Sequence, residues 1–472
     1  MKNNTKIIAT IGPRSCNKNT LKKMIMSGVN VCRLNFSHST HEEHLKIIQL
    51  VKEINRELHV HTAIMADLQG PKIRIGDVKD GVVLEKNNKV IITTKDCLGD
   101  DKLISTNYQQ LPKDVKNGET IMIDDGKIHL RVVSTNKKDR LEALVVYGGP
   151  LHSRKGVNLP NTKISQPCLT EKDLNDLKFI LDQPIEWVGL SFVRSKNDLI
   201  RLKKIIKANK HNAKVIAKIE KPEAIHALNE IIEESDAVMV ARGDLGVEIP
   251  IQRVPVLQKK IVKQCLKSSK PVIIATQMLE SMIENITPTR AEVNDVANSV
   301  MDGADALMLS AETSTGDHPV ETIKVMHKII ADVEQGHQKI KDKNTTPKSG
   351  ARYISNSICF HSCVLAEQVS AEAIITLTHS GYNTFEISSY RPPCKIFAFT
   401  NNHSILNTLS LVWGVTGFYF DSENTTDDTI KETKNILKLN KRLKKGQLVI
   451  NIASMPMKEK GMTNMMKLSY VE

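Results

Sequence analysis

The sequence of 472 residues has few aromatic side chains and no long apolar run. Aromatic residues make up 4% of the chain, which leaves few platforms on which nucleic-acid bases could stack. No stretch reaches the roughly 18 uninterrupted apolar residues that a membrane-spanning helix needs. The first residues, MKNNTKIIATIG, contain no apolar region of signal-peptide length. We therefore expect a cytoplasmic protein that binds neither nucleic acid nor membranes.

Motifs that would mark several other classes of protein are also missing. The eight cysteines include no CxxC pair and no zinc-type spacing, and scattered single cysteines fit a reducing compartment. Neither a Walker A motif nor a GxGxxG loop occurs. These absences argue against a zinc protein, a P-loop enzyme and a Rossmann dehydrogenase.

The charge balance is basic, with a formal net charge of +13 and a pI near 9.2. Such a balance suits nucleic acid, an acidic membrane surface or small anionic substrates. The basic residues are spread along the chain, and the nearest approach to a run is KRLKK at 441–445. Small anionic substrates are the interpretation that this spread favours.

Short apolar runs alternate with longer amphipathic runs, which is typical of parallel βα units. Eight such runs predict strands, at 6–12, 29–37, 61–70, 186–193, 214–220, 236–244, 271–278 and 304–313. A predicted helix follows each strand except the third, where another kind of sequence intervenes. Eight is the number of strands that closes a TIM (β/α)8 barrel.

Two other regions accompany the predicted barrel. Residues 71–165 are strand-like and rich in turn residues, which predicts an inserted all-β domain. A polar stretch near 338–350 reads as a linker, and residues 350–472 predict a smaller α/β domain. The expected organisation is a barrel built from 1–70 and 166–337, a β insertion at 71–165 and a C-terminal domain at 350–472.

Polar side chains stand where the predicted barrel strands end, the edge at which TIM barrels carry their functional residues. Glu220 and Asp244 offer hard oxygen ligands from adjacent strands, suited to Mg²⁺ or Mn²⁺. Arg33, Lys218 and Arg74 supply positive charge for phosphate and carboxylate groups. A divalent cation among fixed positive charges is the usual equipment of phosphoryl transfer.

Longer motifs resemble those of the pyruvate kinase family, in that family's order. They are KIIATIGP, NVCRLNFSHS, ADLQGPKIR, KGVNLP, VIAKIEKPEAI, MVARGDLGVEIP, IIATQMLESM, PTRAEVNDVANSVMDGADALMLSAET and GDHPVE. The resemblance covers residues 5–335 densely and the C-terminal region more loosely. It implies transfer of phosphate from phosphoenolpyruvate to ADP in glycolysis, on a barrel with a β-barrel lid and a C-terminal domain that carries effectors and subunit contacts. A homotetramer is also implied.

The resemblance assigns roles to individual residues. Lys218 stabilises the transition state, and Arg33 and Thr276 act with it. The substrate is bound by Arg33, Gly243, Asp244 and Thr276, and the nucleotide by Asn35, Arg74 and Lys155. The phosphoryl and cation region comprises Asn35, Ser37, Asp67 and Lys72, and the divalent metal is held by Glu220 and Asp244.

An effector site is expected in the C-terminal domain. Thr378, His379, Ser380 and Asn383 lie where a predicted strand passes into a helix, and hydroxyls and amides at a helix N-terminus favour phosphate. A plain helix cap is the alternative. The second wall in relatives, a Gly-rich loop, is here 455–464, with Lys458 and Lys460. A sugar monophosphate or AMP fits this composition as well as fructose 1,6-bisphosphate.

The segment DLQGPKIR departs from the family pattern DTKGPEIR, which carries Thr, Lys and Glu in K⁺-requiring members. Here Leu68, Gln69 and Lys72 take those places. That combination resembles the bacterial K⁺-independent branch of the family. A tethered ammonium at Lys72 can supply the charge that a bound K⁺ would otherwise bring. We therefore expect a requirement for Mg²⁺ but not for K⁺.

Two other classes of function stay open at this stage. One is a barrel enzyme that uses pyruvate or phosphoenolpyruvate without ADP, such as an aldolase or a mutase; the lid and Lys155 argue against it. The other is a non-catalytic basic binding protein, and the presence of Lys218, Glu220 and Asp244 argues against that. An assay for ATP formation separates these alternatives.

Overall fold

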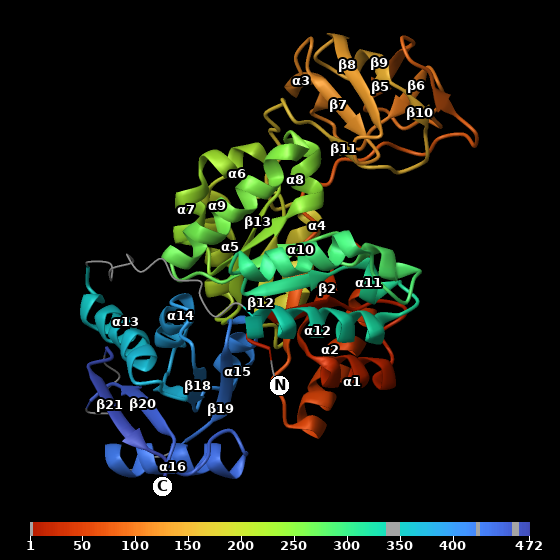
Figure 1. Cartoon of the computed structure of the whole chain (residues 1–472). Helices are drawn as coiled ribbons and strands as arrows, with labels where there is room; N and C mark the ends of the chain where they lie inside the picture. The colour runs from red at the N-terminus through yellow and green to blue at the C-terminus, as the bar shows by residue number, and fades with distance from the viewer. Residues whose placement is uncertain (1–2, 337–349, 422–424, 456–461) are drawn as a thin grey trace.

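The structure, a computed structural model, describes residues 3–336, 350–421, 425–455 and 462–472. An inserted β-rich domain lies at one end of the molecule, a barrel in the middle and an α/β domain at the other end (Figure 1). Eight parallel strands close the barrel in the order β1-β16-β15-β14-β13-β12-β3-β2. They are β1 (Lys6–Thr10), β2 (Val29–Asn35), β3 (Ala63–Asp67), β12 (Trp187–Leu190), β13 (Lys214–Ile219), β14 (Ala237–Ala241), β15 (Val272–Ala275) and β16 (Ala306–Leu309). The predicted TIM-type barrel is confirmed.

Helices surround the barrel strands, and several begin at a side-chain cap. The helices are α1 (Lys18–Ser27), α2 (His41–Leu58), α4 (Glu171–Leu181), α5 (Lys196–Ala208), α6 (Pro222–His226), α7 (Leu228–Glu234), α8 (Arg242–Glu248), α9 (Val254–Lys267), α10 (Arg290–Met301), α11 (Ala311–Ser314) and α12 (Pro319–Gly336). Thr40, Thr170 and Thr289 each form a capping box with the acidic residue three positions later. Each box satisfies backbone N–H groups that a helix start leaves unpaired.

Two apolar clusters stabilise the barrel. One fills the space between strands and helices, and the other fills the barrel interior with side chains such as Ile8, Met65 and Trp187. Leu411, from the C-terminal domain, belongs to the interior cluster. The C-terminal domain thus closes one end of the barrel, and the carboxyl ends of the strands stay available at the other end.

The inserted domain is β-rich, as predicted. Its six-stranded sheet has the order β11-β7-β8-β9-β5-β6, and a second sheet pairs β10 with β4. The strands are β4 (Val83–Leu84), β5 (Lys89–Thr93), β6 (Leu103–Ser105), β7 (Thr120–Ile123), β8 (Ile128–Thr135), β9 (Arg140–Tyr147), β10 (Gly149–Pro150) and β11 (Val157–Asn158), and a four-residue helix, α3 (Leu111–Asp114), lies among them. An apolar cluster from Ile73 to Ile164 gives this domain a core of its own. We call this domain the lid.

The C-terminal domain is a five-stranded sheet with helices, in the order β19-β18-β17-β20-β21. Its elements are α13 (Tyr353–Gln368), β17 (Ala373–Leu377), α14 (Tyr382–Ser389), β18 (Lys395–Thr400), α15 (His403–Thr408), β19 (Val415–Tyr419), α16 (Thr426–Leu439), β20 (Leu448–Ala453) and β21 (Met465–Tyr470). The sequence predicts strands at 372–381, 394–402, 447–454 and near 467–472 but not β19, because Gly417 lowers the strand propensity of that segment. A Cβ at this position would lie 2.9 Å from Leu406 Cδ2, so a larger residue would require the Leu406 side chain to shift.

Within the described residues, no helix is both long and apolar enough to cross a bilayer.

Candidate active site

Asp67, at the end of β3, is the acceptor around which two cationic side chains gather. Arg33, on β2, places Nε 2.8 Å and Nη2 2.7 Å from Asp67 Oδ2. The ammonium of Lys218, on β13, lies 3.2 Å from Asp67 Oδ1. Burial would raise the pKa of Asp67, but Lys218 and Arg33 together hold it below its ordinary value. Asp67 is therefore an anion that fixes both cations at the rim of the barrel.

Lys218 makes two further polar contacts in this buried site. Its Nζ donates to Ser191 Oγ at 2.7 Å and lies 3.0 Å from Glu220 Oε1. Burial by itself would lower the pKa of Lys218, but the carboxylates of Asp67 and Glu220 outweigh burial and raise it above its ordinary value. Lys218 is thus a permanent positive charge, suited to stabilising an anion rather than to giving up its proton.

Glu220 and Asp244 bring two carboxylates to the same rim. Glu220 is buried, and its Oε2 accepts a hydrogen bond from the Phe192 N–H at 2.8 Å. Burial raises the pKa of Glu220; Lys218 opposes this effect, and the nearby negative charge of Asp244 adds to it. Asp244 lies in the first turn of α8. A divalent cation held by Glu220 and Asp244 would offset the effect of the Asp244 charge on Glu220.

The donor set fits a cation of the Mg²⁺ type. In the part of the chain that the structure describes, no group of three or more His, Cys, Asp or Glu side chains forms a complete cage for a metal. Mg²⁺ commonly binds through one or two carboxylates and completes its coordination with water and substrate phosphates. Glu220 and Asp244 are the residues that could hold it.

Thr276 and Gly243 meet next to these carboxylates. The Gly243 N–H donates to Thr276 Oγ1 at 2.8 Å. Thr276 and Gln277 both have a positive φ, of 73° and 53°, an uncommon backbone conformation for such residues. Arg242 supports this turn because its Nη2 donates to Thr276 O at 2.8 Å. The strained turn presents a hydroxyl to the backbone that begins α8.

The predicted nucleotide-binding residues lie partly on the lid and partly on the barrel. Lys155, in the lid, has its Nζ 3.0 Å from Asp124 Oδ1. Arg74 lies where the chain enters the lid, and it forms an isolated antiparallel bridge with Gly156. Asn35 ends β2 on the barrel, and its Oδ1 accepts from the Ser37 N–H at 3.1 Å. These placements hold Arg74 and Lys155 close in space although they are far apart in sequence.

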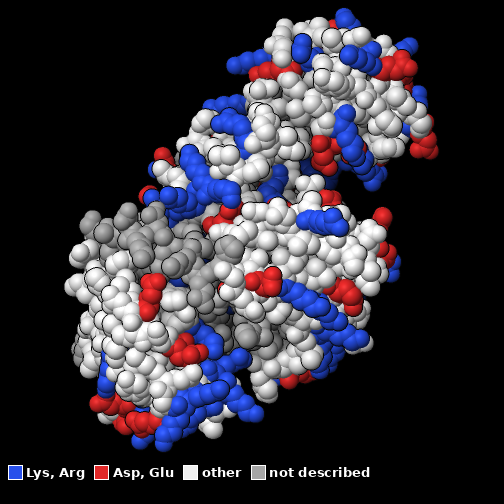
Figure 2. Space-filling model, viewed as in Figure 1, with Lys and Arg blue, Asp and Glu red and all other residues white. Residues whose placement is uncertain are grey.

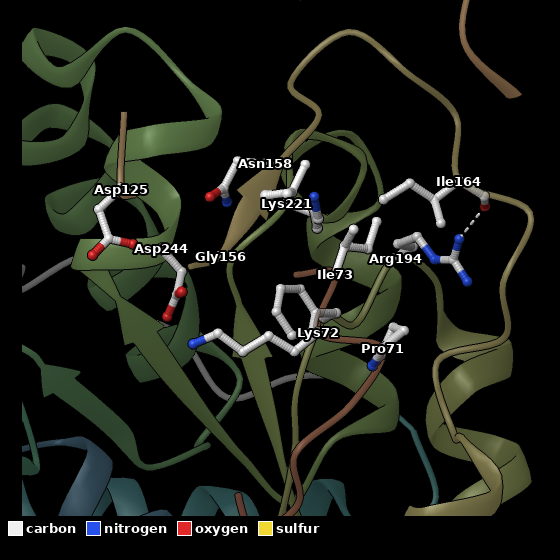
Figure 3. Close-up of a pocket in the computed structure, with 12 residues that line it drawn as sticks. Pro71, Lys72, Ile73, Asp125, Gly156, Asn158, Ile164, Arg194, Lys221 and Asp244 are labelled. Carbon is white, nitrogen blue, oxygen red and sulfur yellow. Dashed lines mark hydrogen bonds between the residues drawn. The ribbon is translucent and has the colours of Figure 1, made fainter. Parts of the chain in front are cut away.

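A pocket lies between the lid and the barrel (Figure 3). Its lining combines residues of the lid entry, the lid exit and the barrel rim: Pro71, Lys72, Ile73, Asp125, Gly156, Val157, Asn158, Ile164, Phe192, Arg194, Lys221 and Asp244. Lys72 extends its ammonium towards the side of the pocket where Asp244 lies (Figure 3). Arg194, on the barrel, contacts the lid because its Nη1 donates to Ile164 O (Figure 3).

Positive charge is concentrated beside the pocket. Burial lowers the pKa of His38, and the charges of Arg74, Lys72 and Arg33 lower it further. These three cations therefore share one region near the end of β2. Such a region attracts phosphate and carboxylate groups.

The predicted effector residues lie at the start of α14. Thr378 Oγ1 accepts from the Gly381 N–H at 2.9 Å, while His379 and Ser380 are exposed. Asn383 donates to Thr463 Oγ1, which lies within the predicted second wall at 455–464. Lys458 and Lys460 lie outside the described residues.

Sequence reasoning missed several polar residues of this region. Ser191 contacts Lys218, and the half-buried Asn158 and the buried Lys221 both donate to the buried Glu248 beside the pocket. Asn158, Lys221 and Glu248 occur within the motifs KGVNLP, KIEKPEAI and ARGDLGVEIP. Their presence in these motifs was a signal that could have identified them.

A (β/α)8 barrel with buried cations, paired carboxylates and a lid over the same rim defines an enzyme that binds phosphorylated, anionic substrates. Family models agree: "pyruvate kinase, barrel domain" matches residues 2–323, and "pyruvate kinase, alpha/beta domain" matches residues 356–469. The chain belongs to the pyruvate kinase family.

Individual relatives cover nearly the whole chain. A pyruvate kinase of Corynebacterium glutamicum is 40% identical over 466 residues, covering 98% of this chain and 97% of its own. One of Geobacillus stearothermophilus is 40% identical over 478 residues, covering 100% of this chain and 81% of its own. The crystal structure of a pyruvate kinase from Cryptosporidium parvum superposes with a TM-score of 0.93 at 34% identity, covering 100% of this chain and 96% of that one. The predicted enzyme class is confirmed.

Proposed function

We propose that this pyruvate kinase transfers phosphate from phosphoenolpyruvate to ADP with Mg²⁺, or Mn²⁺, held by Glu220 and Asp244. The observation that carries the proposal is the convergence of Lys218, Arg33 and the carboxylates of Asp67 and Glu220 at one rim. Bound there, the cation would supply positive charge for phosphate and enolate oxygens. The paired carboxylates favour a divalent over a monovalent ion.

The chain's own residues then have distinct tasks. Arg33 binds the substrate phosphate, and its orientation is fixed by Asp67 and by Thr10 Oγ1, 2.9 Å from Nη1. Lys218 stabilises the enolate oxygen that forms when phosphate leaves, and keeps its own proton. Gly243 and Thr276 help to hold the substrate carboxylate. Fixed charges of this kind need no reorganisation during the reaction.

The nucleotide is bound between the two bodies, by Asn35 from the barrel side and by Arg74 and Lys155 from the lid side. Ser37 and Lys72 complete the phosphoryl region. Lys72 lines the same pocket as Asp244, which supports our proposal that its ammonium replaces K⁺. The enzyme would then belong to the K⁺-independent branch of its family.

We also propose domain limits at 1–70 with 166–337, 71–165 and 350–472. A homotetramer is supported by exposed apolar side chains on the barrel, including Ile251, Val256 and Ile286, and on the edge strand β21. A phosphorylated effector would bind at Thr378, His379, Ser380 and Asn383.

The proposed location is the cytoplasm, with no binding of nucleic acid or membranes. Lys and Arg side chains lie on all three domains with acidic side chains among them (Figure 2), which fits a solvated surface better than a single polyanion site.

The test of this function measures pyruvate and ATP formation with Mg²⁺ titrated from zero, in buffer whose ionic strength is held with tetramethylammonium. The proposal predicts that activity requires both ADP and the divalent ion. It also predicts that Glu220→Gln and Asp244→Asn each lower the activity and raise the Mg²⁺ concentration needed for half-maximal activity. An unchanged Mg²⁺ requirement in both variants would contradict the cation assignment.

A further inference from the structure

A buried carboxylate at the end of α8 joins the lid to the barrel. Glu248 Oε1 accepts from Lys221 Nζ at 2.6 Å and from Asn158 Nδ2 at 2.9 Å. Asn158 is the last residue of β11, on the lid. On the barrel, Lys221 directly follows Glu220, two residues after the end of β13. One oxygen atom is therefore the common acceptor for a lid residue and a barrel residue.

The Lys221–Glu248 ion pair is buried, and burial of charged groups carries a desolvation penalty. The side chains of Glu248 and Lys221 are 1% and 7% exposed. The second oxygen, Glu248 Oε2, receives no hydrogen bond from any described residue. A buried pair with an unsatisfied atom is a poor way to stabilise a fold, because apolar side chains of the same volume commonly do as well or better. The presence of this buried ion pair is therefore better explained by a role in function than by a contribution to stability.

The positions of the two charged residues supply that reason. Lys221 is the neighbour of Glu220, and Glu248 lies one helical turn after Asp244 on α8. The Lys221–Glu248 pair therefore ties together the two segments that carry the cation-binding carboxylates. Lys221 Nζ also lies 5.8 Å from the ring centre of Phe192, whose N–H donates to Glu220.

Asn158 connects the lid to the same carboxylate, Glu248. It lies three residues after Lys155, the lid residue proposed to bind the nucleotide. In the close-up, Asn158 lies on the lid strand and lines the pocket together with Lys221 and Asp244 (Figure 3). A lid held at this point keeps Lys155 at a fixed distance from the barrel carboxylates.

We propose that Glu248 is a positioning residue that holds the lid in register with the cation site. Through Asn158 it sets where Lys155 meets the nucleotide, and through Lys221 it sets the spacing of Glu220 and Asp244. This inference rests on the proposed roles of Glu220, Asp244 and Lys155. It adds a specific contact that couples lid position to the metal-binding segments.

The first test is Asn158→Ala, which removes the lid contact and leaves the Lys221–Glu248 pair intact. We expect the Kd for ADP with Mg²⁺, measured by calorimetry, to rise about tenfold, as loss of one hydrogen bond to a charged group would give. The Kd for phosphoenolpyruvate should change less than about twofold, because Asn158 does not reach the barrel residues that bind it. Asn161→Ala, at an exposed site on the same segment, is the matched control and should change neither constant.

An exchange of donor and acceptor tests the contact itself. Asn158→Asp alone sets two carboxylates against each other and should weaken ADP binding more than Asn158→Ala. Adding Glu248→Gln lets the new amide donate to the new carboxylate, which also lies near Lys221. We expect this double variant to recover most of the lost ADP affinity.

Two results would overturn the inference: unchanged ADP affinity in Asn158→Ala, or no recovery in the double variant. Equal weakening of both substrates in Asn158→Ala, with a lower thermal midpoint, would also overturn it, since that outcome marks a purely structural role. Failure of the proposed function is seen separately, in Glu220→Gln and Asp244→Asn, because those variants leave Asn158 in place and are read by their Mg²⁺ requirement.

Discussion

The ammonium of Lys218 lies 3.2 Å from Asp67 Oδ1, and both side chains are almost completely withdrawn from solvent. The two residues come from β13 and β3, with β12 between them in the sheet. Because Asp67 also holds Arg33, one carboxylate sets the positions of both cations at this rim of the barrel. Positioned charge of this kind is the main requirement of phosphoryl transfer.

Lys218→Met should lower kcat by roughly two to three orders of magnitude, the range seen when a single charge-stabilising donor is removed. Phosphoenolpyruvate should still bind, because Arg33 keeps its contacts with Asp67 and Thr10. Steady-state kinetics and equilibrium binding together measure this split. Lys204→Met, on the exposed face of α5, is the control; near-normal kcat in Lys218→Met would refute the role.

Lys72→Glu should make the enzyme dependent on K⁺. The change alters the charge beside the pocket by two units, which is a large effect in a partly dehydrated cleft. We expect the wild type to be fully active in K⁺-free buffer, and the variant to lose activity there and regain part of it with K⁺. Lys86→Glu makes the same charge change at an exposed lid position and should behave as wild type. Strong K⁺ activation of the wild type would contradict the prediction.

Glu186 should make stability depend on pH. Burial raises the pKa of its carboxyl from 4.5 to about 7, although Ile64 N and Asn407 Nδ2 donate to it at 2.7 and 2.9 Å. The folded protein therefore keeps this proton to a higher pH than the unfolded chain does, so stability is lost as the pH rises from about 4.5 to about 7.

Glu186→Gln removes this titration while keeping the shape of the side chain. Relative to wild type, the variant should gain about 1–3 kcal/mol of unfolding free energy between pH 5 and pH 8. Denaturant unfolding at the two pH values measures the difference. A difference between variant and wild type that is the same at both pH values would show that Glu186 does not titrate in this range.

Arg391→Leu should destabilise the junction of the barrel and the C-terminal domain. Its guanidinium lies 2.9 Å from Asp305, with both side chains 4% exposed, and it packs over the Trp413 ring. Removing one partner of a buried pair costs about 3–5 kcal/mol. Arg14→Leu breaks an exposed pair with Asp317, where both side chains are more than half exposed, and should cost less than about 1 kcal/mol. Thermal unfolding compares them, and equal effects would contradict the prediction.

Ser380→Asp should abolish regulation by a phosphorylated effector. The exposed Ser380 precedes α14 by two residues, so a negative charge there would repel a phosphate bound at the helix start. The KM for phosphoenolpyruvate is measured with AMP, sugar monophosphates and fructose 1,6-bisphosphate, for wild type and for Ser380→Asp. Asn435→Asp, exposed on α16, controls for the added charge. No change of KM in the wild type with any compound would refute an effector site of this chemistry.

The sequence by itself determined the architecture and the inventory of the active site. The short apolar runs predict the barrel strands and the amphipathic runs predict the helices. This works because the periodicity of apolar residues within each segment reflects the face that the segment buries. The polar residues that end the strands, such as Lys218 and Glu220, necessarily reach one rim because parallel strands share a direction. The strand β19 was not predicted because Gly417 weakens the strand pattern of its segment, and only the folded structure pairs this segment with β18.

The tertiary structure alone decided which residues contact a common acceptor or form a buried pair. Asn158 and Glu248 are 90 positions apart, and Arg33 and Lys218 meet on Asp67 from strands far apart in the chain. The pairing of Glu186 with Asn407 likewise needs the C-terminal domain to dock against the barrel. Periodicity specifies the face on which a side chain lies, whereas a buried contact depends on the packing of whole elements, which no local pattern encodes.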